Sequence, residues 1–212
     1  MITKGNSSPK YYFIGGVNGV GKTTVLEHIV NFNKNRKNKK EKYILLKGSC
    51  LLMKWLGIKD KDYKTLRTLN PKFKNRETGK MILQIMRSNH GKGITYLFDG
   101  HFIHYNNGKP VDVIGGWIKK FSILIFISAS TKNILNRSLT DKNKERDLFP
   151  SYLKYRDKIK IISEYQKITL EKVKETSKKF SIPYIIIKNN SSIDHFVKTF
   201  IQMEKTLDKK IK

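Results

Sequence analysis

The feature that most constrains this chain is the glycine-rich stretch FIGGVNGVGKTT at residues 13–24. The pattern G-x-x-x-x-G-K-S/T is filled by Gly16, Gly21, Lys22 and Thr23. Its glycines let the backbone curl until successive N–H groups point at phosphate oxygens. A short apolar run precedes the stretch at residues 11–14, and apolar residues recur at helical spacing behind it. The sequence therefore predicts a strand, a phosphate-binding loop and a helix, in that order.

Each polar residue of the loop has an expected role. Lys22 would reach the β and γ phosphates of ATP, the Thr23 hydroxyl would bind Mg²⁺, and Thr24 would approach the α-phosphate. The positive end of the following helix points at the same anion. The residues expected to hold the nucleotide here are Gly16, Asn18, Gly19, Val20, Gly21, Lys22, Thr23 and Thr24. ATP and Mg²⁺ are thus the expected cofactors.

Apolar runs and helical patterns alternate along the chain. Strands are predicted at residues 11–14, 43–47, 94–98, 122–128 and 183–188. They lack polar alternation, which is typical of parallel strands buried on both faces. Helical patterns occupy residues 23–32, 50–56, 75–88, 111–119, 131–139, 150–179 and 193–207. We expect an α/β fold of three layers, as in P-loop NTPases, formed by residues 1–212 as a single domain.

The chain is strongly basic, with 44 Lys+Arg against 17 Asp+Glu and a formal net charge of +27. Such a charge attracts nucleic acid and other polyanions without any specific site. Abundant asparagine and isoleucine accompany the lysines, and no RNP-like, helix-turn-helix or zinc pattern does, so we expect nonspecific nucleic-acid binding at most. The densest run, residues 34–42, is expected to be a solvated connector.

Two further observations concern the cellular setting. Cys50 is the one cysteine, so the chain cannot form an internal disulfide. The first residues contain no apolar signal region, and no apolar run approaches a membrane span. We expect a protein of the reducing cytoplasm with no membrane partner.

The segment FDGH, residues 98–101, follows the third predicted strand. At the end of that strand, Asp99 is expected to hold the Mg²⁺ hydration shell or to orient an acceptor, as a Walker-B-type carboxylate does. Asp-Gly is also a common turn pair. His101 and His104 lack a third ligand for zinc, so we expect them to line the cleft or to pack against it.

A polar stretch, ILNRSLTDKNKERD at residues 134–147, follows the fourth predicted strand. Such stretches form mobile lids in phosphoryl-transfer enzymes, where arginines stabilise the charge of the phosphoryl group in transit. We expect a lid near residues 137–149, with Arg137 and Arg146 as its catalytic residues. The alternative is an exposed, salt-bridged helix end.

These segments together resemble the archaeal-type adenylate kinases and their P-loop nucleoside-monophosphate-kinase relatives. GGVNGVGKTT is similar to that family's phosphate loop, KGSCLLM at residues 47–53 to the start of its acceptor region, and DYKTLRTL at residues 62–69 to the segment with an acceptor-phosphate arginine. The resemblance implies an acceptor-binding insertion near residues 48–90. The acceptor residues that it implies are Arg67, Gly48, Ser49, Met53 and His101.

The C-terminal half continues the resemblance. The stretch at residues 134–147 resembles the family's lid, and IIIKNN at residues 185–190 resembles its last strand, with Asn189 in the adenine-side loop. The sequence departs from the family's pattern at Gly100, where threonine is usual, at Lys144, where arginine is usual, and at Tyr165, where histidine is usual. The resemblance also implies a sheet in the order 2-3-1-4-5.

The function expected from the resemblance is transfer of the γ-phosphoryl group of ATP to a nucleoside monophosphate, first of all AMP. More residues support the ATP side than the acceptor side. A relative that phosphorylates another small molecule therefore remains open. So do a nucleotide-binding P-loop ATPase without kinase activity, with or without RNA on its basic surface, and a polynucleotide 5′-kinase.

Overall fold

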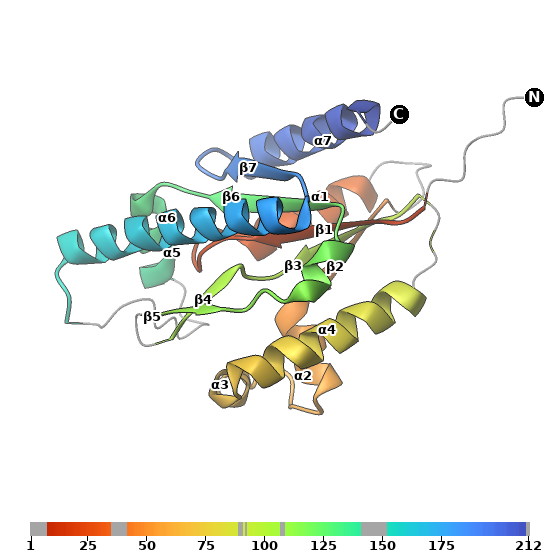
Figure 1. Cartoon of the computed structure of the whole chain (residues 1–212). Helices are drawn as coiled ribbons and strands as arrows, with labels where there is room; N and C mark the ends of the chain where they lie inside the picture. The colour runs from red at the N-terminus through yellow and green to blue at the C-terminus, as the bar shows by residue number, and fades with distance from the viewer. Residues whose placement is uncertain are drawn as a thin grey trace, which may run out of the picture.

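The chain folds as strands and helices that alternate along the sequence (Figure 1). The computed structural model describes residues 8–34, 42–88, 91, 93–106, 109–140 and 152–210. The elements are β1 (Lys10–Gly15), α1 (Lys22–Lys34), β2 (Tyr43–Lys47), α2 (Gly48–Trp55), α3 (Tyr63–Thr68), α4 (Pro71–Ser88), β3 (Thr95–Asp99), β4 (Ile103–Asn106), β5 (Lys109–Asp112), the 3₁₀ helix η1 (Gly116–Lys120), β6 (Ile123–Ser128), α5 (Thr131–Thr140), α6 (Tyr155–Phe180), β7 (Tyr184–Lys188) and α7 (Ile193–Lys210).

Five strands form one parallel sheet in the order β2-β3-β1-β6-β7. When only the five predicted strands are numbered, this is the expected order 2-3-1-4-5, so the predicted α/β fold and sheet are confirmed. β1 lies in the centre, paired with β3 on one side and with β6 on the other. Because the strands are parallel, their carboxyl ends lie along one edge of the sheet, where ligands bind in such folds.

Both faces of the central strands β1, β3 and β6 are buried, as β1 shows, whereas Tyr184 and Ile186 of the edge strand β7 are exposed. Tyr12 and Ile14 pack into the core on the side of α1 and α7, whereas Tyr11 and Phe13 pack into a second core on the side of α4. Successive side chains of a strand point to opposite faces, which accounts for this division. Figure 1 shows α7 and α4 on opposite sides of the sheet. The unbroken apolar runs of the central strands are therefore buried between helices on both faces, but the run at residues 183–188 was wrongly expected to be buried in the same way, because it forms the edge of the sheet.

A buried carboxylate fastens α7 to the sheet. Glu204 is 0% exposed and accepts hydrogen bonds from the Lys42 ammonium, the Tyr43 hydroxyl and, at 3.1 Å, the Thr95 hydroxyl. A buried charge is tolerated only when it is paired and hydrogen-bonded. The three donors come from the amino ends of β2 and β3, so this contact joins the last helix to that edge of the sheet.

A hairpin replaces one expected helix. The sequence predicts a helix at residues 111–119, but β5 pairs antiparallel with β4 in this region, and only the short η1 follows. The prediction was wrong because the first residues of this segment pair with β4 as a strand and its last residues form a 3₁₀ helix. Asn-Gly between two strands is a strong hairpin signal, and it occurs at residues 107–108.

The structure tests the expectations about a membrane span, the connector and the lid only within the described residues. Within the ranges described above, no helix is both long and apolar enough to cross a bilayer. The expected connector at residues 34–42 lies outside those ranges except at its ends, and the expected lid lies outside them from residue 141 on.

Candidate nucleotide-binding site

The loop between β1 and α1 has a backbone that requires glycine at several points. Gly19 and Gly21 have φ angles of 86° and 84°, a left-handed conformation that L side chains rarely adopt. A Cβ atom on Gly16 would lie 2.3 Å from the carbonyl oxygen of Ile127. Lys22, which is buried, donates from Nζ to the Gly16 carbonyl at 2.9 Å and so spans the loop. The loop therefore closes around the position of its lysine.

A hydroxyl and a carboxylate meet at the mouth of this loop. Thr23 donates from Oγ1 to Oδ2 of Asp99 at 2.7 Å. Asp99 is the last residue of β3 and is in register with Ile14 of β1. Strand pairing therefore brings Asp99 beside the phosphate loop, although 76 residues separate it from Thr23.

The chemistry of these donors suits Mg²⁺. This ion prefers oxygen ligands and is bound by one or two protein groups together with phosphate oxygens and water. Thr23 and Asp99 offer a hydroxyl and a carboxylate side by side. Among the described residues, no group of three or more His, Cys, Asp or Glu side chains could hold a metal by itself. The site fits a metal that arrives with the nucleotide better than a metal held by protein groups alone.

Two distant segments brace the loop at one carbonyl. Val20 accepts from the Asn189 amide at 2.7 Å and from Nη1 of Arg137 at 3.0 Å, and Nη2 of Arg137 lies 3.4 Å from the Asn189 carbonyl. Asn189 is buried, and burial lowers the pKa of the Arg137 guanidinium. Arg137 on α5 and Asn189 after β7 thus support the loop at the Val20 carbonyl, next to Gly21. The second expected lid arginine, Arg146, lies outside the described residues.

The expected acceptor residues lie at three places: on α2, on α3 and, for His101, between β3 and β4. Gly48 and Ser49 begin α2 directly after β2, where a Cβ on Gly48 would lie 2.8 Å from the Asp99 carbonyl. Met53, in the same helix, is 1% exposed and offers little surface to a ligand. Arg67 is exposed on α3, and its carbonyl accepts from the Lys74 ammonium at 3.4 Å.

His101 and His104 lie together, with 4.6 Å between their ring centroids. The pKa of His104 is lowered to about 4, because the surrounding protein desolvates the ring and because Lys74, Lys22 and Arg67 are nearby cations. The side chain of His104 is nevertheless exposed to solvent. The sequence left open whether His101 and His104 line the cleft or pack against it. It did not single out Lys74, for which it contains no local signal.

Packing explains two of the three positions at which the sequence departs from the pattern of the family that it resembles. A Cβ at Gly100 would lie 2.7 Å from the Phe13 ring, so a threonine would not fit here without a shift. Tyr165 on α6 stacks with Tyr105 of β4 at 3.6 Å between ring centroids, and its carbonyl accepts from the Tyr105 hydroxyl at 2.9 Å. Tyr165 therefore fixes the hairpin to α6. The third departure, Lys144, lies outside the described residues.

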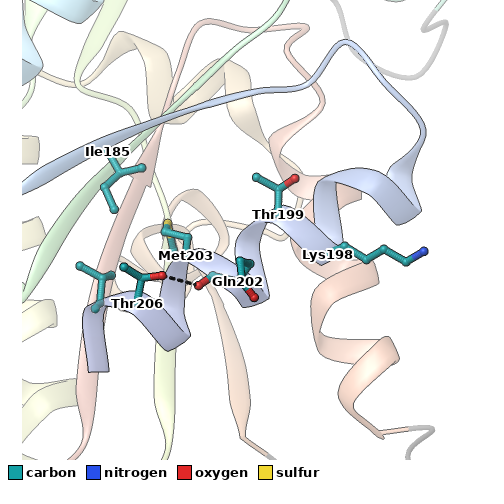
Figure 2. Close-up of a pocket in the computed structure, with 7 residues that line it drawn as sticks. Ile185, Lys198, Thr199, Gln202, Met203 and Thr206 are labelled. Atoms are coloured by element: carbon teal, nitrogen blue, oxygen red, sulfur yellow. Dashed lines mark hydrogen bonds between the residues drawn. The ribbon is translucent and has the colours of Figure 1, made fainter. Parts of the chain in front are cut away.

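The surface also has an open hollow far along the chain from the loop, between β7 and α7 (Figure 2). It has a volume of about 580 Å³ and is lined by Ile185, Lys198, Thr199, Gln202, Met203, Thr206 and Leu207. None of these side chains belongs to the phosphate loop or to the β3 end. The hollow is separate from the nucleotide site.

The loop at the end of β1, the carboxylate at the end of β3 and the order of the sheet together define a P-loop nucleotide-binding domain with a kinase-like fold. The chain belongs to the AAA domain family, whose model matches residues 15–149. Among solved structures it is similar to shikimate kinase from Bacteroides thetaiotaomicron, with 11% identity and a TM-score of 0.55 over 92% of this chain and 98% of that chain. At this identity the similarity shows the fold alone. No curated protein matches the sequence.

Proposed function

We propose that this protein transfers the γ-phosphoryl group of ATP to a nucleoside monophosphate, with AMP as the first candidate. The observation that carries the proposal is the contact of Thr23 with Asp99 at the mouth of the phosphate loop. Thr23 follows Lys22 in the chain, so the two oxygens would hold Mg²⁺ beside the lysine. Lys22, Lys74 and Arg67 are cations near His104, which supports an acceptor site close to the nucleotide site.

The protein's part in the reaction is to position and to neutralise charge. Lys22 would leave the Gly16 carbonyl for the β and γ phosphates, and the loop N–H groups would bind the remaining phosphate oxygens. Bound Mg²⁺ would supply charge neutralisation across the β and γ oxygens. Thr23 and Asp99 are the residues that would hold it. Phosphoryl transfer requires little covalent chemistry from the protein. Residues that position the reactants and neutralise their charge are therefore the kind of residues that the reaction needs.

Arg67 would bind the acceptor phosphate. A planar guanidinium offers a phosphate two parallel hydrogen bonds, where a lysine offers one point charge. Arg67 is exposed at the end of α3, next to Lys74. Replacement of Arg67 by alanine should raise the KM for the monophosphate far more than the KM for ATP, because the lost contact belongs to the acceptor.

A phosphotransfer screen tests this function. The purified protein is incubated with ATP·Mg²⁺ and, separately, with AMP, CMP, GMP, UMP, dTMP, shikimate and an oligonucleotide with a free 5′-hydroxyl. ADP-forming transfer to a monophosphate supports the proposal, and Lys22→Ala should abolish this activity without loss of the fold. Transfer only to the oligonucleotide would identify a polynucleotide kinase. Binding of ATP with no transfer to any acceptor would favour the nucleotide-binding alternative.

A further inference from the structure

The strand β7 ends the sheet on one side, and some of its backbone groups face outward. Within the described residues, β7 pairs with β6 alone. The Pro183 carbonyl accepts from β6 at 3.0 Å and the Asn189 N–H donates to β6 at 2.7 Å. Because alternate residues of a strand direct their N–H and C=O groups to opposite sides, the residues that face away from β6 are Tyr184, Ile186 and Lys188. The described part of the chain gives these three residues no backbone partner outside β7.

The side chains of this edge strand are apolar on both faces. Ile187 is buried and Ile185 partly buried in the core that α7 covers, whereas Tyr184 and Ile186 are 37% and 42% exposed. The first charged residue of β7 is Lys188, at its end. Soluble proteins usually protect an edge strand with charges, proline or a bulge, because its open backbone groups are a template for another strand. The middle of β7 lacks this protection.

The open hollow between β7 and α7 adjoins this strand. Figure 2 shows Ile185 on β7 across from Met203 and Thr206 of α7. Ile185, Met203 and Leu207 supply apolar surface to the hollow. A strand added along β7 would place every second side chain on the same face as Ile185, where the hollow lies. The hollow could therefore receive an apolar side chain from such a strand.

The charges at this edge favour an acidic occupant. Lys188 is exposed at the end of β7, and Lys198 lines the hollow, whereas no carboxylate lines it. Neither lysine belongs to an ion pair within the described residues. A second copy of this chain would bring the same lysines and a net charge of +27 to the edge, so charge opposes self-association here. An acidic segment would instead be attracted.

We propose that β7 is a docking edge for an extended, acidic segment of a partner protein, which adds a further strand to the five-stranded sheet. Main-chain hydrogen bonds to Tyr184, Ile186 and Lys188 would hold its backbone. One apolar side chain would enter the hollow beside Ile185, and carboxylates would lie near Lys188 and Lys198. This surface is separate from the phosphate loop, so the inference stands whether or not the proposed kinase function holds.

Peptide binding tests the docking edge. The probes are blocked, fluorescent peptides of about ten residues in which glutamate alternates with valine, leucine or tyrosine. Each is titrated with the full-length protein at physiological ionic strength, and the fluorescence anisotropy is measured. At least one acidic peptide should bind saturably, and the same peptides with lysine in place of glutamate should not bind. Failure of every acidic peptide to bind, or equal binding of the lysine peptides, would overturn the proposal.

Variants of the edge locate the binding. Ile186→Pro removes one outward N–H and leaves the bonds to β6 in place, because proline is tolerated on the open side of an edge strand. It should weaken peptide binding at least about tenfold, whereas Ile186→Val, which keeps the N–H, should bind within about threefold of wild type. Equal binding by the two variants, with unchanged melting temperatures, would contradict docking at β7.

A second pair of variants leaves the strand untouched. Lys198→Glu and Lys205→Glu change the net charge of the protein equally, and both lysines are exposed on α7. Lys198 lines the hollow and Lys205 does not. Lys198→Glu should therefore weaken binding of the acidic peptide several times more than Lys205→Glu. Equal losses would show that the peptide responds to the overall charge alone, and a wild-type dimer in sedimentation that Ile186→Pro abolishes would give the edge to a second copy; either result overturns the proposal.

Discussion

The contact between Thr23 and Asp99 predicts a specific pattern of metal-dependent binding. The hydroxyl and carboxylate oxygens are 2.7 Å apart, a short distance that is typical of a hydrogen bond to a charged group. Such bonds contribute about 1.5–3 kcal/mol. If both oxygens also serve the metal, Thr23→Val and Asp99→Asn should each weaken binding of ATP·Mg²⁺ by roughly 10- to 150-fold. The double variant should lose little more than the weaker-binding single variant.

Isothermal titration calorimetry can measure these changes in the affinity for ATP·Mg²⁺ directly. Wild type, the two single variants and the double variant are titrated with ATP in excess Mg²⁺ and again in EDTA. In EDTA all four proteins should bind ATP within about threefold of one another, because the metal no longer contributes. Thr199→Val, on an exposed position of α7, should leave both affinities unchanged. Losses that add fully in the double variant, or that persist in EDTA, would refute the assignment of this pair to the metal.

The remaining predictions concern Arg137 on α5, the stability of the fold, the effect of acid and the effect of salt. Arg137→Ala should lower kcat by about tenfold or more, as measured in the phosphotransfer assay, given the larger effects of arginine fingers elsewhere; normal turnover would reduce Arg137 to a brace of the loop. Glu204→Ala should lower the free energy of unfolding in urea by about 3–5 kcal/mol, because it removes the carboxylate that accepts from two buried hydroxyls and from Lys42; a loss below about 1 kcal/mol would show that water replaces the carboxylate. The pKa of Glu77 is lowered to about 2 by its hydrogen bonds from Lys80, Trp55 and Arg76. Its stabilising contribution is therefore complete above about pH 4.5, its ordinary pKa, and is lost as the pH falls towards 2, which a change in Trp55 fluorescence in wild type, absent in Glu77→Gln, should report. Binding to generic RNA should fall steeply with added salt, as counterion release requires, and a sequence-selective complex that survives about 0.3 M salt would instead indicate a specific nucleic-acid site.

The sequence was sufficient for the fold and the loop because both depend on local patterns. The buried parallel strands are unbroken apolar runs, and Gly19 and Gly21 of the phosphate loop have φ angles near 85°, which other residues rarely adopt. Asp99 could be placed as well, since its position follows from the end of one strand. These features are determined by residues close to one another in the sequence.

The surroundings of Lys74 and His104 could not be found in this way. Lys74 is one of many lysines, and only the packing of α4 makes it half-buried with no carboxylate among the described residues as its partner. His104 acquires its direction from the stack of Tyr105 on Tyr165, which joins segments 60 residues apart. Tertiary contacts of this kind leave no period or spacing in a single sequence, and the sequence analysis predicted no strand for β4, which carries His104.

The carbonyl of Val20 joins three segments that are far apart in the chain: the phosphate loop, α5 through Arg137 and the end of β7 through Asn189. The loop can keep this form only while α5 and the last strand are in place. Nucleotide binding is therefore thermodynamically linked to the folding of the β6–β7 side of the sheet. At an ATP concentration 100 times the Kd, the native state would gain about 2.7 kcal/mol, and hydrogen exchange in β7, an edge strand, should slow along with exchange in the loop.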